Sequence, residues 1–472
     1  MEMRENVELL GRARECFDSL REFRGERDRC KRYTCGDQWG DLIEDGGRMV
    51  RESDYIRSQG NMPLKNNLIR RLVRNVLGVY RNRYAPPVCH NVDGDLDTDV
   101  ERINRRLRET MDKNRLEELY ARTMEEFLIG GLAVHKKWYG MRRGETGCQT
   151  DMVPPSRFFF DTSARDFRGS DVTIVGEVHE IRFEELVPSF ATSPTDIDNL
   201  EKAYGMNLGN AGREICTVYE VWERRKPMLL ECHDRRTGRL YSVEAEAEAS
   251  IADENRRRRC AGLPGIDTRW RVREQWHYSF LTPTGRVLRS GKSPYAHGSH
   301  PYVFKAYPFI DGEIHSFVSD IIDQQKFTNR LISMYDWILR ASAKGVLLFP
   351  EGSLPDGVDI NDIADEWGRF NGVIVYRPRP GVPIPQQVSS NSTDIGITGL
   401  LEIQMKMMED VSGVNGALQG KLESNSMSGT LYDQQTRNSM TALVDLLKSF
   451  DDFVAEATRM DVSNIRQFII AN

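Results

Sequence analysis

Long apolar runs are missing from this 472-residue sequence. No stretch approaches the roughly 18 consecutive apolar residues that a membrane-spanning helix needs. The first twenty residues carry Arg4, Arg12 and Arg14 where a secretion signal would have an apolar centre. We therefore expect no membrane partner and no signal peptide.

Paired cysteines and a basic surplus are missing as well. The eight cysteines are scattered without the C-x-x-C spacing of a zinc site, so we expect reduced thiols, no bound metal and no cofactor. The net charge is −6. Proteins that grip DNA tightly through its phosphates usually carry excess positive charge, so this balance argues against a sequence-reading DNA binder.

No motif supplies a credible active site. Three residues separate Gly416 from Gly420 where a phosphate-binding loop has four between its glycines, and Leu422 follows Lys421 in place of Ser or Thr. His233 and Asp234 are neighbours on an expected strand and point to opposite faces. The best candidate for metal-assisted nuclease chemistry is Asp320 and Asp323, one helical turn apart beside Lys326. Such a charge group on a long helix is more often a solvated face or a contact between subunits.

Helical and strand-like patterns are both plentiful. Apolar residues at helical spacing predict helices over 5–31, 66–83, 316–343 and from about 430 onward, and a helical region over 97–139 interrupted at Gly130–Gly131. Residues 172–179 and most of 217–309 read as strands, with a helix inserted at 242–259. A short mixed section follows, with strands at 346–349 and 373–376 around a helix at 361–367.

These patterns predict an α+β protein that is mainly helical. We read the block 213–310 as a separate β-rich insertion between helical parts. The expected divisions are an N-terminal helical segment (1–60), a mainly helical part (61–212), the β-rich insertion (213–310), a long helix (311–345), a short mixed part (346–415), and a polar loop with a second long helix (416–472).

Four segments in this order resemble the portal proteins of tailed phages, especially the group similar to portals of short-tailed phages of the P22 type. They are Pro154–Asp166 (PPSRFFFDTSARD), Val218–Arg224 (VYEVWER), the stretch from Ser293 to Arg330 ending in DIIDQQKFTNR, and Asp410–Gly420 (DVSGVNGALQG). Each is weak alone, but their shared order makes the resemblance fairly specific. It covers about residue 66 to the C-terminus.

The resemblance implies a non-enzymatic ring, typically a dodecamer, with wing, stem, clip and channel-lining elements. It implies a wing at 61–212 and, returning, at 346–415, a clip-like insertion at 213–310, a stem helix at 311–345, and a channel loop with a tunnel helix at 416–472. It implies that double-stranded DNA passes through the ring without specific binding during packaging and ejection. The implied partners are further copies of the chain, the large terminase subunit, capsid and scaffold proteins, and tail or adaptor proteins. The implied locations are the portal vertex of the virion and, during assembly, the host cytoplasm. Longer members continue past the tunnel helix into a crown or barrel, whereas this sequence stops at Asn472.

Three groups of residues are candidate sites. We expect a channel-facing loop, a subunit interface on the helix over 316–343, and a partner contact at the end of the helix over 242–259. The members of these groups are, in that order, Lys421, Ser424, Asn425 and Ser426; Asp320, Asp323, Lys326 and Arg330; and Arg256, Arg257, Arg258 and Arg259. The more common role of such a group is a solvated C-terminal turn, where positive charge suits the helix dipole, and a contact with an acidic partner or with DNA is the alternative.

Two other functions stay open. One is another head–tail adaptor, although adaptors are usually shorter and lack a strand-rich insertion between long helices. The other is a metal-dependent DNA-processing enzyme that uses Asp320 and Asp323.

Overall fold

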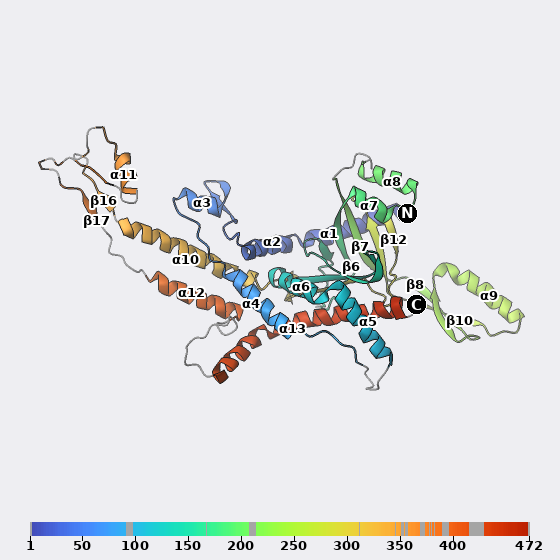
Figure 1. Ribbon diagram of the computed structural model, residues 1–472. Helices are drawn as coiled ribbons and strands as arrows, with labels where there is room; N and C mark the ends of the chain where they lie inside the picture. The colour runs from blue at the N-terminus through green and yellow to red at the C-terminus, as the bar shows by residue number, and fades with distance from the viewer. Residues whose placement is uncertain are drawn as a thin grey trace. The chain divides into compact units, whose positions relative to one another are not determined.

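The computed structural model describes residues 2–90, 98–166, 168–206, 214–310, 312–344, 346–350, 354, 357–368, 373–376, 378, 380–381, 383–388, 396–414 and 429–470 (Figure 1). Helix makes up 49% of the chain and strand 24%, which confirms the expected α+β class with more helix than strand. The chain forms two compact units, residues 1–31, 72–320 and 416–472 in the first and residues 32–71 and 321–415 in the second.

The centre of the first unit is a five-stranded antiparallel sheet. Its order is β12 (Val287–Lys292), β11 (Gln275–Leu281), β7 (Ile215–Arg225), β6 (Ile174–Arg182) and β5 (Phe158–Phe160). Helix α1 (Glu2–Ser19) packs on β5, β6 and β7. The apolar side of α1, including Leu9, Leu10 and Ala13, enters the main hydrophobic core there.

Strand β5 shows how alternation builds this core. Successive side chains of a strand point to opposite faces. The ring of Phe159 meets Phe17 of α1 edge-on, with ring centres 6.3 Å apart. The rings of Phe158 and Phe160 instead pack against Phe304 at 5.3 and 5.1 Å. All three residues of this short strand are therefore buried.

A second antiparallel sheet in this unit has the order β13 (Tyr302–Ala306), β3 (Leu132–Arg142) and β4 (Glu145–Met152). Helices α5 (Thr98–Asn114), α6 (Leu116–Gly130) and α13 (Gly429–Ile465) pack on it. Residues 132–139 are thus strand, and the predicted continuation of the helical region to residue 139 is wrong. Gly131 ends α6 with a φ of +74°, and a Cβ there would lie 2.4 Å from the carbonyl oxygen of His315, so the chain must turn at this glycine.

A third sheet belongs to a small module with its own core. Strands β8 (Met228–Asp234), β9 (Arg239–Val243) and β10 (Ile266–Val272) pair in the order β10-β8-β9, and α9 (Glu248–Cys260) is inserted between β9 and β10. The helix predicted over 242–259 is present but begins at Glu248, because Ser242 and Val243 belong to β9. The core of the module consists of Leu230, Cys232, Ile251 and Ile266.

The reading of 213–310 as one separate insertion is corrected by the sheets. Strands β7, β11 and β12 of this block pair with each other and with β6, and β13 pairs with β3. Only residues 228–272 form a sheet of their own. Sequence patterns identify strands but not their partners, so they could not reveal these pairings.

Further elements complete the first unit. Helices α7 (Phe183–Phe190) and α8 (Pro194–Tyr204) form a side cluster around Phe183, Leu186 and Leu200. Strands β14 (Phe309–Ile310) and β15 (Glu313–Ile314) form a short hairpin. A π-helical turn, Arg466–Ile470, follows α13, and its Phe468 stacks on Tyr139 with ring centres 4.4 Å apart.

In the second unit, amide side chains of α10 (Ser319–Lys344) hold the segment before and at the start of α4 (Leu68–Arg83). The Gln325 side-chain oxygen accepts hydrogen bonds from the backbone N–H groups of Leu68 and Ile69, at 2.9 and 3.2 Å. Asn329 donates to the side chain of Gln38 at 2.7 Å. These three side chains are buried. The network satisfies N–H groups that the first turn of a helix leaves without a partner.

The rest of the second unit surrounds α10. Helix α2 (Arg21–Cys35) ends in it, and the hairpin of β1 (Leu42–Asp45) and β2 (Arg48–Arg51) turns through Gly46 and Gly47 and leads into α3 (Glu52–Ser58). Beyond α10 come β16 (Val346–Leu348), α11 (Ile360–Gly368), β17 (Gln386–Val388) and α12 (Ile397–Ser412). The strand predicted over 373–376 is wrong, because β16 pairs with β17 and residues 373–376 have no regular structure.

Candidate functional site

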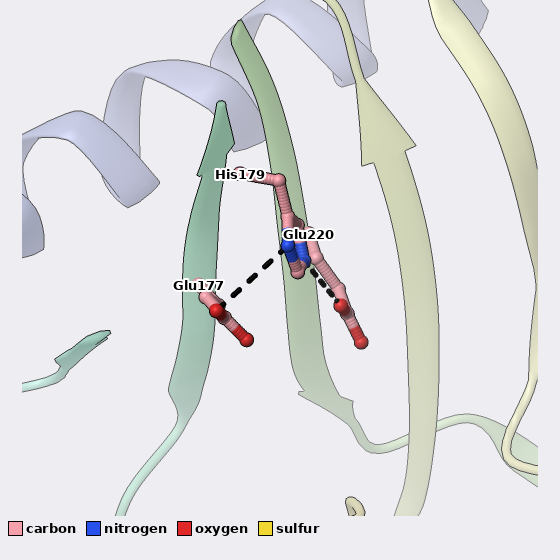
Figure 2. Close-up of side chains that lie close together, drawn as sticks. All are labelled: Glu177, His179 and Glu220. Atoms are coloured by element: carbon pink, nitrogen blue, oxygen red, sulfur yellow. Dashed lines mark hydrogen bonds and ion pairs between the residues drawn. The ribbon is translucent and has the colours of Figure 1, made fainter. Parts of the chain in front are cut away.

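A buried group of ionisable side chains lies where β6 and β7 pair. Glu177 and Glu220 are direct partners in the register, and His179 lies two residues further along β6 (Figure 2). Nε2 of His179 lies 2.7 Å from Oε2 of Glu220, and its Nδ1 lies 3.8 Å from Oε1 of Glu177. Within the described residues this is the one group of three or more potential metal ligands, with ligand atoms all within 4.8 Å of one another.

Two further side chains complete the surroundings of Glu220. The ammonium of Lys136, from β3, donates to Oε2 of Glu220, and the indole of Trp222 donates to Oε1 at 2.9 Å. Burial by itself would raise the pKa of Glu220, but Lys136 and His179 together hold this pKa well below its usual range. Burial raises the pKa of Glu177, which has only weaker opposing charges.

The chemistry of this group fits a structural network better than a metal centre. A His and two carboxylates are suitable ligands for zinc-like ions. However, both oxygens of Glu220 already accept hydrogen bonds, and a bound cation would have to displace or sit beside the Lys136 ammonium. The ion pair of Lys136 with Glu220 links β3 of one sheet to β7 of another, so its evident role is to join the two sheets.

The sequence did not reveal this group, although it holds a signal. Both glutamates lie close to fully buried apolar residues of their own strands. Glu177 comes two residues after Val175, and Glu220 directly precedes Val221. A buried carboxylate needs a partner of opposite charge. The position of that partner, Lys136, depends on sheet packing and could not be deduced from spacing along the chain.

The candidate nuclease pair is not assembled into a site. Asp320 and Asp323 are exposed on α10, and neither belongs to a group of three potential ligands in the part of the chain that the structure describes. Lys326, the third member of the proposed trio, directs its ammonium to Asp41 at 3.1 Å.

The residues predicted for a subunit interface have internal partners in two cases. Besides the pair of Lys326 with Asp41, the guanidinium of Arg330 lies 2.9 Å from the Glu52 carboxylate, which is almost fully buried. The side chain of Arg330 is nevertheless 59% exposed. These ion pairs fasten α10 to the segment 41–52, and Arg330 can make a further contact.

The four arginines at the end of α9 do not behave alike. Arg258 turns toward the module, where its guanidinium makes two hydrogen bonds to Asp234, at 2.8 and 3.2 Å, and one to Glu254. Arg256 pairs with Asp253. Arg257 and Arg259 are exposed. Any partner contact at this site thus depends on the exposed arginines, while Arg258 serves the fold.

The residues predicted to face a channel, Lys421, Ser424, Asn425 and Ser426, lie outside the described residues.

An apolar groove in the second unit was not predicted. We call it the Trp337 groove. It encloses about 440 Å³ and is lined by Trp39, Ile43, Glu52, Tyr55, Ile56, Asn61, Arg330, Ser333, Met334 and Trp337. Its lining comes from residues nearly 300 positions apart, so only the folded unit assembles it.

An open groove with a mainly apolar lining is the kind of surface that marks a contact with another protein. No helix within the described ranges has both the length and the apolar character needed to cross a membrane. A comparison with protein-family models matches residues 10–472 to the phage P22-like portal proteins, and the chain therefore belongs to this family. No curated protein matches the sequence.

The family assignment confirms the resemblance seen in the sequence. Portal proteins are head-to-tail connectors, structural components of the phage capsid that form oligomeric rings and contact the capsid and the packaging machinery.

Proposed function

We propose that this chain forms a ring, a dodecamer by resemblance to other portals, at one vertex of the phage capsid. DNA enters through the ring during packaging and leaves through it during ejection. The ring docks the large terminase subunit first and tail or adaptor proteins later, and it catalyses no reaction itself. The observation that carries this proposal is the family match over nearly the whole chain.

The arrangement of the second unit supports a specific assignment of portal parts. Helices α10 and α12 contact each other, because the side chain of Gln404 donates to the backbone oxygen of Gln324 at 3.4 Å and to its side-chain oxygen. The segment between them carries β16, α11 and β17. We assign α10 and α12 as paired stem helices and residues 346–388 as the clip that docks partners.

This assignment changes two of the divisions expected from the sequence, the clip-like insertion at 213–310 and the returning wing part at 346–415. The clip moves from 213–310 to 346–388, because strands of 213–310 share sheets with segments on either side of it. The first unit, with its sheets and α13, becomes the wing and tunnel helix. In this proposal the loop before α13, with Lys421, Ser424, Asn425 and Ser426, faces the DNA.

The first experiment tests ring formation. We expect native mass spectrometry of the purified protein to show one closed oligomer whose mass is a whole multiple of 54.2 kDa. Negative-stain electron microscopy should show rings with a central hole. Gold-labelled antibodies against the chain should mark a single vertex on virions of the phage that encodes it. Monomers alone over a wide range of salt and concentration, together with no vertex label, would contradict the proposal.

A matched variant separates the portal from a nuclease. Asp320→Ala with Asp323→Ala removes both carboxylates of the candidate metal site. We expect neither the wild-type ring nor the double variant to cleave duplex DNA with magnesium. Cleavage by the wild type that the double variant lacks would favour the enzyme.

A further inference from the structure

Helix α12 carries an apolar stripe on its exposed side. The residues of the stripe follow each other at intervals of three and four, and they are Leu400, Ile403, Met407 and Val411, exposed by 45, 54, 50 and 51%. This spacing places all four on one side of a helix. Other residues of the same helix, including Gln404 and Met408, are buried within the unit. The helix thus has one side packed in its own unit and another apolar side left uncovered.

The Trp337 groove has a complementary character. Its walls are mainly apolar and aromatic, and two residues at its edge, Met334 and Trp337, are 46% and 54% exposed. Three or four aliphatic side chains would fill a volume of this size. The exposed charge in its lining is the Arg330 guanidinium. Asp410 of α12 is exposed and lies beside the stripe, about 20° around the helix from Ile403.

The stripe and the groove lie on different sides of α10. Gln324 of α10 contacts α12, whereas Trp337 and Met334 of α10 line the groove. At about 100° per residue, Trp337 points roughly 140° away from Gln324 around the helix. A single subunit therefore cannot bury its own stripe in its own groove without unfolding this arrangement.

A ring requires this kind of surface pair. Its contacts are heterologous, meaning that one face of each subunit meets a different face of the next. In a closed ring every copy supplies one stripe and one groove, so none is left uncovered. A foreign partner on either surface would leave the other exposed, and large exposed apolar surfaces favour aggregation.

We propose that the α12 stripe of one subunit inserts into the Trp337 groove of the neighbouring subunit. The inference rests on the proposed ring, and it names the surfaces that close it. The docking follows the helix-in-groove mode, in which side chains at i, i+3 and i+7 act as anchors. Arg330 then lies at the rim, where its charge suits the Asp410 carboxylate of α12.

Cysteine crosslinking tests the contact directly. The background variant carries Cys35→Ser and Cys260→Ser, because these two native cysteines are exposed. Met407→Cys and Trp337→Cys are then added together, and assembled protein is treated with a short bismaleimide. We expect a ladder of covalent multimers on denaturing gels from the double variant and none from either single variant. Met407→Cys with Met228→Cys, an exposed residue outside the groove, is the matched control.

A second experiment tests the same contact by placing a charge in the stripe. We expect Ile403→Asp to reduce the yield of rings roughly tenfold or more, because a carboxylate would be buried without a partner. Lys406→Asp, on the polar part of the same exposed side, should leave ring yield unchanged. Circular dichroism should give the same spectrum for the wild type and for both variants, since residues 403 and 406 are exposed.

The outcomes separate the two proposals. Absence of rings from the wild type and absence of vertex label on virions would refute the proposed function. Wild-type rings that also form at full yield with Ile403→Asp, and that give no crosslinked ladder, would refute the docking alone. Full ring yield with loss of terminase or adaptor binding would assign the stripe to a foreign partner and likewise overturn the inference.

Discussion

At the scale of single residues, the clearest roles in this protein belong to buried polar side chains that hold elements together. The clearest case is Lys137 on β3 and Asp461 on α13, whose charged atoms lie 2.6 Å apart and whose side chains are 0% and 1% exposed. Lys137 also donates to Thr150 at 2.9 Å. Burial raises the pKa of Asp461, and the nearby ammonium opposes this rise. The pair fixes the last helix on the sheet.

We expect Asp461→Ala to destabilise the protein by about 3–5 kcal/mol, because it leaves the Lys137 ammonium buried without a partner. The double variant Lys137→Met with Asp461→Leu should be more stable than this single variant, since it removes both charges. Urea unfolding followed by tryptophan fluorescence measures the difference. Lys448→Ala, which breaks the exposed pair with Asp452 on the same helix, is the control and should have no measurable effect. Equal stability of Asp461→Ala and wild type would refute this role.

His300 makes stability depend on pH. Complete burial, with a smaller contribution from His297, lowers the pKa of His300 to about 3. The unfolded chain takes up this proton near pH 6.5. Between pH 6.5 and 3 the unfolded state therefore binds more protons, and stability falls as the pH falls through this window. His300 packs edge-on against Trp276, with ring centres 4.6 Å apart, and only 8% of its surface is exposed.

We expect His300→Gln to flatten this acid dependence. The difference in unfolding free energy between wild type and variant should change by up to about 1.4 kcal/mol per pH unit between pH 6 and 4, because only the wild type loses stability through this group. Urea unfolding at several pH values measures it. Parallel stability curves would show that His300 does not titrate as its burial implies.

At the scale of elements, the adjacent arginines at the end of α9 have different roles. Arg258 holds the helix to β8 through Asp234, whose pKa its guanidinium keeps well below the usual range. Arg257 and Arg259 point outward on the same turn. A run of four arginines in the sequence therefore contains at least one anchor of the fold and two residues open to a partner.

We expect Arg258→Ala to lower the unfolding temperature of the module, because the Asp234 carboxylate loses its main partner. Arg257→Ala and Arg259→Ala should leave that temperature unchanged. If the exposed arginines contact a portal partner, their double replacement should weaken its binding while the rings still form. Calorimetry and pull-down with the terminase or adaptor protein distinguish these effects. A stability loss as large for Arg257→Ala as for Arg258→Ala would contradict the division of roles.

Elements with strong periodicity were predictable, and elements defined by their neighbours were not. The helices at α4, α9, α10 and α13 and the strand β6 lie close to their expected positions. Residues 132–139 were expected in a helix and form β3, because the turn at Gly131 and the pairing with β13 and β4 decide their conformation. Helix α12 was missed although Leu400, Ile403, Met407 and Val411 recur at intervals of three and four, a signal that the sequence itself contains.

At the scale of the whole molecule, the charge balance is consistent with the proposed passage of DNA. Each subunit has a net charge of −6, so a ring of many copies is strongly acidic overall. Non-specific binding to DNA is supplied almost entirely by cationic contacts to phosphates. A channel that held these contacts tightly would slow the movement of DNA through it.

We expect assembled rings to bind duplex DNA only weakly, with a Kd of about 1 µM or weaker at physiological salt and equal values for unrelated sequences. Fluorescence anisotropy of two labelled duplexes, one rich in A·T and one rich in G·C, measures this. Nanomolar binding, or a large preference for one duplex, would contradict a sliding channel.

The sequence by itself determined the α+β class, the long amphipathic helices and, through four ordered segments, the portal family, because periodicity and motif order are local properties of the chain. The tertiary structure alone decided the rest. It placed Lys136 beside Glu220, limited the separate β module to 228–272, paired Lys326 and Arg330 with acidic residues some 280 positions away, and assembled the Trp337 groove. These features depend on contacts between distant segments, and no local pattern encodes which segments meet.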